Sequence, residues 1–254
     1  MAIWLVILLG AVQGLTEFLP VSSSGHLLLL QRCLGDASAK ENMYFDLALH
    51  VGSAFAVIVA YRAKILSLFR KGNRKKLAWL AIATLPAALV GVVFQSRLSA
   101  LFSGDFLLFG FLTTAFLLLV CEWQAKRVIH PKPFTFRAAL CMGIMQAVAV
   151  IPGLSRSGST IFGGTLVGAE REEVADFSFL MSLPIILGGA AYGALSGGGG
   201  ALPLSTLALG ALTAFVIASV ALVWAKRAIK RARYYGFALY LLGLSALLVF
   251  FRYF

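Results

Sequence analysis

Charged residues are scarce in this sequence. Only 13% of its 254 residues are Asp, Glu, Lys or Arg, and only 10 are acidic. Soluble domains contain about 25% charged residues, so the composition excludes an ordinary soluble globular protein. Hydrophobic residues make up 60% of the chain, and its mean hydropathy is +0.91. The sequence therefore predicts an integral membrane protein.

Cysteines are few, and nucleotide-binding motifs are absent. The three cysteines form no CxxC pair, so we interpret them as small apolar side chains rather than metal ligands or disulfide partners. The phosphate-binding patterns GxxxxGK(S/T) and GxGxxG do not occur at a strand-to-helix turn. We therefore expect no organic cofactor.

The net charge of +12 is unevenly distributed. Of the 22 Lys and Arg residues, 16 lie in three segments, 62–76, 126–137 and 226–233. In a soluble protein such a charge would point to a nucleic-acid partner, but in a membrane protein basic residues concentrate in cytoplasmic loops. We expect these three segments to be cytoplasmic loops, and we expect no nucleic-acid partner.

Long apolar runs occupy most of the remaining sequence. Each can cross about 30 Å of hydrocarbon as an α-helix, which rises about 1.5 Å per residue. A polar segment at 31–43 and an acidic segment at 170–176 are expected to form further loops. The pattern predicts an all-α membrane protein with six spanning helices, at about 44–61, 77–94, 106–124, 177–196, 204–224 and 235–251.

Two other apolar segments, 3–30 and 138–168, are interrupted near their middles. Pro20 and the run Ser22–Gly25 divide the first, and Pro152–Gly153 with the run Ser155–Gly158 divides the second. Each half is too short to cross a membrane, and non-helical backbone at that depth occurs only where protein or a water-filled cavity surrounds it. We predict two re-entrant helical hairpins, with a Pro-kinked spanning helix as the alternative for the first.

The two interrupted segments resemble each other. With an offset of 133 positions, five residues of the first coincide with identical residues of the second: Gly10, Gln13, Ser22, Ser24 and Gly25. Each half of the chain then holds one hairpin and three spans, and this odd number of crossings gives the halves opposite orientations. We predict a single membrane domain, 1–254, built from inverted repeats at about 1–124 and 138–254, in which broken helices meet around a central site.

Polar residues at the two breaks point to an anion-binding site between facing hairpin tips. An ionised side chain in hydrocarbon costs about 2.5–3.5 kcal/mol, so Glu17 requires compensation, which Arg156 can supply. Helix N-termini and glycines suit a phosphate or carboxylate, and the arginine adds a planar fork for phosphate oxygens. Packing of small polar residues is the alternative for either stretch alone. The expected cradle comprises Ser22, Ser24, Gly25, Ser155, Ser157, Gly158 and Thr160, with Gln13 as a hydrogen-bonding scaffold.

Glu17 and His26 flank the first break, so both are candidates to act on a ligand held by Arg156. A carboxylate there can hold a divalent cation on a diphosphate or act as a general base. Histidine can attack phosphorus or protonate a leaving group, the alternative being a hydrogen-bonded histidine at the membrane interface. His50, early in an apolar span, is interpreted as structural or as a support to the site.

The stretches Gln13–His26 and Pro152–Thr160 resemble the two signature motifs of the undecaprenyl-diphosphate phosphatase family of the BacA/UppP type. Leu49–Gly52 and Phe177–Pro184 add to this resemblance, which extends over nearly the whole chain. It implies hydrolysis of undecaprenyl diphosphate to the monophosphate, which recycles the carrier lipid of peptidoglycan synthesis and is linked to bacitracin resistance. It also implies the bacterial inner membrane, a magnesium or calcium ion, and an active site facing the periplasm.

The resemblance extends to individual site residues. Those that match the family's functional positions are Glu17, Ser23 and His26 in the first motif and Ser155, Arg156 and Thr160 in the second. Some members carry glutamate where this chain has Gln13, so here Glu17 would be the only carboxylate of the motif available to a metal ion. The nucleophile stays open between Ser23, His26 and water.

Two classes of function are compatible with these residues. The first is a membrane-embedded phosphatase that binds the diphosphate head of a lipid at the hairpin tips while the isoprenoid tail stays in the bilayer. The second is a transporter or flippase for lipid phosphate, because inverted repeats with broken helices are a transporter architecture. Transport alone does not explain Ser23 and His26 beside an anion cradle, so we expect the enzyme. Small residues on the spans permit a homodimer.

Overall fold

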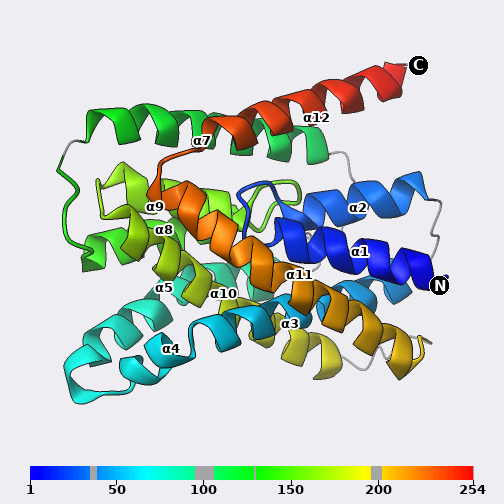
Figure 1. Cartoon of the computed structure of the whole chain (residues 1–254), viewed down its shortest axis with the longest axis horizontal. Helices are drawn as coiled ribbons and strands as arrows, with labels where there is room; N and C mark the ends of the chain where they lie inside the picture. The colour runs from blue at the N-terminus through cyan, green and yellow to red at the C-terminus, as the bar shows by residue number, and fades with distance from the viewer. Residues whose placement is uncertain (35–38, 95–105, 129, 196–201, 254) are drawn as a thin grey trace.

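The computed structural model describes residues 1–34, 39–94, 106–128, 130–195 and 202–253 (Figure 1). In these ranges helices are the regular elements, together with one isolated β-bridge between Lys132 and Ala169. The helices are α1 (Ile3–Thr16), α2 (Ser23–Cys33), α3 (Ala39–Ala60), α4 (Arg62–Leu68), the 3-10 helix η1 (Lys71–Asn73), α5 (Arg74–Val93), α7 (Leu107–Arg127), α8 (Phe136–Val148), α9 (Arg156–Leu166), α10 (Arg171–Leu195), α11 (Leu204–Lys230) and α12 (Tyr235–Tyr253).

Five of the described helical segments are long and apolar enough to cross a membrane. They are Met43–Ala60, Lys71–Val93, Leu107–Arg127, Arg171–Leu195 and Leu204–Lys230. The sixth predicted span corresponds to α12, whose apolar part Tyr235–Phe250 belongs with the shorter helices. Large apolar side chains such as Leu89 and Phe116 are more than 60% exposed on these helices, as expected for a surface that faces lipid. The chain is a multi-pass membrane protein.

Two pairs of short helices, α1–α2 and α8–α9, enter the bundle from opposite sides (Figure 1). The chain leaves the helical conformation between Glu17 and Ser22 in the first pair and between Ala149 and Ser155 in the second. Both breaks fall where proline and small polar residues predict them, because proline removes a helical N–H and serine bonds to nearby backbone. Each pair brings one non-helical tip to the middle of the molecule.

The first helix of each pair packs against a helix from the other half of the chain. Helix α1 lies along α11, and α8 lies along α5 (Figure 1). Both contacts depend on glycine: a Cβ atom on Gly10 would lie 2.8 Å from the Gly210 carbonyl oxygen, and one on Gly143 would lie 2.6 Å from that of Ala83. Gly10 and Gly143, which coincide in the sequence repeat, therefore both allow a neighbouring helix to approach closely.

Several segments expected to be loops are helical. Helix α3 begins at Ala39, inside the polar segment 31–43, and α10 begins at Arg171, inside the acidic segment 170–176. The basic segment 62–76 contains α4 and η1, and α11 extends into the basic segment 226–233 as far as Lys230. Hydropathy locates the part of a helix that lies in hydrocarbon, whereas the backbone hydrogen bonds continue for one or two turns into the polar region.

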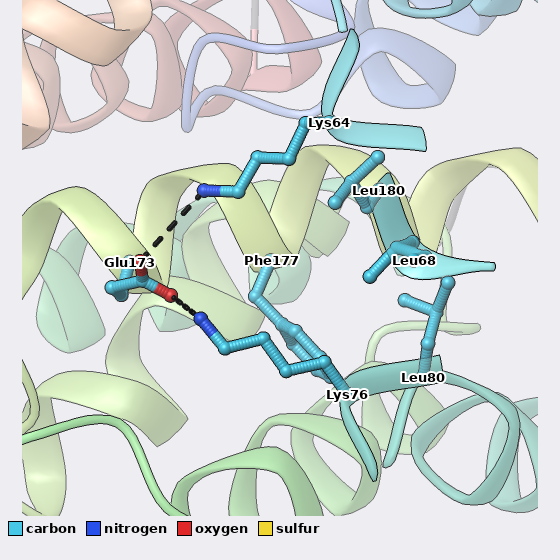
Figure 2. A pocket seen from close by; sticks show the side chains of 7 residues that line it. All are labelled: Lys64, Leu68, Lys76, Leu80, Glu173, Phe177 and Leu180. Carbon is cyan, nitrogen blue, oxygen red and sulfur yellow. Dashed lines mark hydrogen bonds and ion pairs between the residues drawn. The ribbon is translucent and has the colours of Figure 1, made fainter. Parts of the chain in front are cut away.

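Asp176, in the part of α10 that the sequence predicts as a loop, bonds to residues of several other helices. Its carboxylate accepts hydrogen bonds from Lys64 at 2.7 Å and from the Tyr61 hydroxyl at 2.6 Å, and it pairs with Lys226 at 2.8 Å. Beside it, Glu173 pairs with Lys64 and Lys76, and the side chains of Leu68, Leu80, Phe177 and Leu180 line the small pocket between them (Figure 2). The cluster thus ties α10 to α3, α4, α5 and α11.

Replacing Asp176 by asparagine is expected to destabilise the fold. The amide cannot neutralise the ammonium groups of Lys64 and Lys226, which are 31% and 32% exposed. A loss of about 2–3 kcal/mol, between the values for exposed and buried pairs, corresponds to about 5–10 °C in the midpoint of thermal unfolding in detergent. The control is Glu172→Gln, one turn earlier on α10, whose side chain is 39% exposed and pairs with Lys226 and Lys230. Exposed pairs contribute little, so this change should shift the midpoint far less. Equal shifts in the two variants would contradict this account.

Candidate functional site

Glu17 is buried at the break after α1. Its side chain is 4% exposed, and both carboxylate oxygens have partners. Oε1 pairs with Nη2 of Arg156 at 2.6 Å, while Oε2 accepts hydrogen bonds from the Ser23 hydroxyl at 2.6 Å and from the Gln13 amide at 2.9 Å. A buried charge is costly unless it is paired and hydrogen-bonded, and Glu17 meets both conditions.

Arg156 brings the second hairpin tip to the first. It is the first residue of α9, and its guanidinium also donates to the Ser178 carbonyl on α10 at 3.3 Å. A second bond joins the tips, from the Ser157 hydroxyl to the Leu19 carbonyl at 3.0 Å. The compensation of Glu17 by Arg156 that the sequence implies is therefore realised in the structure, between residues 139 positions apart.

The two tips begin their second helices in the same way. The Ser22 hydroxyl accepts a hydrogen bond from the Gly25 N–H at 3.3 Å, and the Ser155 hydroxyl accepts one from the Gly158 N–H at 3.1 Å. Both serines are N-caps, which satisfy one of the free N–H groups at a helix start. The remaining N–H groups give each tip a partial positive charge that favours an anion. Ser24 lies half-buried in the first turn of α2.

Thr160 and Gln13, both expected at the site, hold other site residues in position. The Thr160 hydroxyl is buried and bonds to the Arg156 and Ser157 carbonyls and to the Ser178 hydroxyl, so it fixes α9 against α10. Gln13 uses its amide to hold Glu17, and its buried carbonyl oxygen has no hydrogen-bond partner among the described residues. This oxygen is an acceptor that water or a ligand can use.

His50 lies closer to the charged pair than the sequence indicates. Its Nε2 is 3.6 Å from Oε2 of Glu17, and its Nδ1 is 2.7 Å from the Asp46 carbonyl oxygen. Ser53, one turn further along α3, lies 3.5 Å from the Gln13 amide. The detectable signal was the i, i+3 spacing of these two polar residues, which places both on one face of an apolar helix.

His26 is held away from the charged pair in this structure. Its ring contacts Tyr240 of α12 and Phe111 of α7, and no contact described for it involves Glu17, Arg156 or Ser23. The structure therefore assembles Glu17, Ser23 and Arg156 directly, with His50 added, whereas the contacts described for His26 are with Ser22, Tyr240 and Phe111.

Among the residues that the structure describes, the side chains alone do not form a closed metal site. The described residues contain no cluster of three or more His, Cys, Asp or Glu side chains that could hold a metal ion. Glu17 is the carboxylate at the tips, and both of its oxygens are already bonded to donors. A hard cation takes at least six oxygen ligands, so most of its ligands here would come from water and from the bound molecule.

A buried ion pair between facing helix breaks, with serine hydroxyls around it, gives this integral membrane protein a charged centre. Residues 6–247 match the family described as bacitracin resistance protein BacA, and the chain belongs to this family. Similar relatives are the undecaprenyl-diphosphatases of Christiangramia forsetii, 38% identical over 98% of each chain, and Rubrobacter xylanophilus, 40% identical over 95% of each. That of Alteromonas mediterranea is 35% identical over 99% of each chain.

Proposed function

We propose that this chain is a membrane-embedded undecaprenyl-diphosphate phosphatase, which releases inorganic phosphate and leaves undecaprenyl phosphate. The observation that carries the proposal is the Glu17–Arg156 pair, buried between two helix N-termini and next to the Ser23 hydroxyl. The relatives named undecaprenyl-diphosphatase match along nearly their whole length. The product is the carrier lipid that peptidoglycan synthesis reuses.

Substrate binding exchanges partners at Arg156. Diphosphate oxygens take the place of Glu17 at the guanidinium fork, and the N–H groups at the starts of α2 and α9 bind the remaining charge. The hydrogen bond to the Ser178 carbonyl already holds the Arg156 guanidinium in position before the substrate binds. Little reorganisation is therefore needed during the reaction. The isoprenoid tail stays in lipid beside the apolar helices.

The contact between Ser23 and Glu17 favours the serine as nucleophile. Its hydroxyl already donates to Oε2 at 2.6 Å, so Glu17 can take the proton as the oxygen attacks the terminal phosphorus. The bond between that phosphorus and the bridging oxygen breaks, and undecaprenyl phosphate leaves. Water then hydrolyses the phosphoserine, and inorganic phosphate departs. His50, 3.6 Å from the same carboxylate oxygen, is placed to receive the proton next.

A magnesium or calcium ion is proposed to arrive on the diphosphate. Glu17 and the Gln13 carbonyl, which has no hydrogen-bond partner among the described residues, are the groups that would hold it, and the ion would neutralise phosphate charge. The replacement of a second carboxylate by Gln13 leaves one negative charge for the metal, so we expect weaker binding of the free ion than of its complex with substrate.

The membrane arrangement proposed for this function is that of two inverted repeats. In it α1–α2 and α8–α9 are re-entrant hairpins from opposite sides, α12 completes six crossings, and the segments rich in Lys and Arg are cytoplasmic. The exchanged packing of α1 on α11 and α8 on α5 supports this arrangement. The first hairpin then opens to the periplasm, which is the proposed side of substrate entry.

The decisive experiment is phosphate release by the purified protein in detergent. We expect release from undecaprenyl diphosphate with magnesium, loss of release with a chelator, and no release from undecaprenyl phosphate. Thin-layer chromatography should identify the lipid monophosphate as the product. Binding of the lipid without release would disprove the phosphatase assignment and favour a lipid-phosphate transporter.

A further inference from the structure

His26 is enclosed by aromatic side chains, and Tyr240 on α12 makes two of its contacts. The Tyr240 hydroxyl lies 2.8 Å from Nε2 of His26. The two rings are stacked, with centroids 5.6 Å apart and an angle of 10° between their planes. Phe111 of α7 packs edge-on against the imidazole at 5.4 Å. Three helices, α2, α7 and α12, therefore fix one imidazole ring.

The hydrogen bonds of His26 select one tautomer. Its Nδ1 lies 2.7 Å from the carbonyl oxygen of Ser22. A carbonyl only accepts hydrogen bonds, so Nδ1 carries the proton. In the neutral ring Nε2 then has the free lone pair and accepts a hydrogen bond from Tyr240. As a result, Nε2 is the nitrogen that can exchange a proton with a ligand.

We propose that Tyr240 is a positioning residue for His26, an inference that rests on the proposed phosphatase activity and in which His26 exchanges a proton with the bound molecule through Nε2. The stacked ring holds the imidazole plane, and the hydroxyl donates to Nε2 until water or a protonated phosphate oxygen replaces it as the donor. Tyr240 is 50% exposed, so its ring has room to move aside. Tyr240 acts through His26 and does not itself contact the substrate.

Kinetics of Tyr240→Phe test the role of the hydroxyl, because phenylalanine keeps the stacked ring. We expect kcat to fall about tenfold with KM changed by less than about twofold, the range for loss of a group that orients a functional histidine. The control is Tyr235→Phe on the same helix, where the exposed side chain makes no contact with His26 among those described, and the rate should not change. Equal kcat in wild type and Tyr240→Phe would overturn the proposal.

A double mutant separates positioning from a structural role. In a His26→Asn background, Tyr240→Phe should have no further effect on kcat, because the partner through which it acts is gone. A merely structural role predicts the same loss in both backgrounds. The same factor in both would therefore also overturn the proposal.

¹⁵N NMR of the full-length protein in micelles, with ¹⁵N-labelled histidine, tests the contact between His26 and Tyr240 without relying on activity. Signals of His26, assigned with His26→Asn, should report the Nδ1–H tautomer in both proteins, because the Ser22 carbonyl still accepts from Nδ1. The shift of Nε2 should change in Tyr240→Phe, because Nε2 loses the hydrogen bond from the hydroxyl. An unchanged Nε2 shift in Tyr240→Phe would overturn the inference. If wild type released no phosphate while Tyr240→Phe still altered the Nε2 shift, the phosphatase assignment would fail and the positioning contact would stand.

Discussion

Replacing Arg156 by alanine is expected to lower kcat/KM for undecaprenyl diphosphate by at least about a thousandfold, the range found when an arginine that stabilises phosphoryl transfer is removed. The change removes both the fork for the phosphate oxygens and the partner of Glu17 at 2.6 Å. Phosphate release at saturating and limiting substrate separates the losses in kcat and in binding. Activity above about a tenth of wild type would contradict a site centred on this residue.

Three matched variants identify the cause of that loss. Arg156→Lys keeps the charge without the planar fork and should fall between wild type and Arg156→Ala. Arg137→Ala removes an exposed arginine from the start of α8 and should leave the rate unchanged. Alanine at 156 also leaves Glu17 buried and unpaired, which destabilises the protein. Adding Glu17→Gln should restore thermal stability without restoring activity, and this separates misfolding from lost catalysis.

The charged pair could be predicted from the sequence because hydrocarbon allows few alternatives. A carboxylate at Glu17 and a guanidinium at Arg156, each at a break in an apolar segment, need compensation that water cannot supply. The breaks themselves follow from proline and serine, whose local chemistry acts within a few residues. Helix breaks caused by local residues, and an ion pair that has no alternative partner in hydrocarbon, can therefore be predicted from a single sequence.

Contacts that depend on helix rotation could not be predicted in the same way. His50 reaches Glu17 and Tyr240 reaches His26 because of the angles at which α3 and α12 turn their faces inward. The spacing of His50 and Ser53 indicates that they share a face of α3, but the hydrophobic pattern does not say which residues that face contacts. The ends of α10 and α11 were missed for a related reason, since their polar turns are stabilised by ion pairs between distant segments, such as Asp176 with Lys226.

Helix α3 approaches α11 closely at Gly52. A Cβ atom there would overlap the carbonyl oxygen of Ala211 and lie 2.8 Å from its Cα, and backbone atoms cannot rotate away as a side chain can. Helix α11 also packs along α1, which carries Gln13. A larger residue at 52 would therefore separate helices that hold the Glu17 site.

Gly52→Ala is expected to lower the midpoint of thermal unfolding by about 5–10 °C, because overpacking a tight contact costs about 1–3 kcal/mol or more, and Gly52→Leu should abolish folded protein. The control is Gly188→Ala on α10, where no atom lies within 4 Å of the added Cβ. Since alanine favours helices more than glycine does, this control should melt at or above the wild-type temperature. Equal midpoints for the two alanine variants would mean that α3 and α11 can separate without cost, and the glycine contact would not be what holds His50 against Glu17.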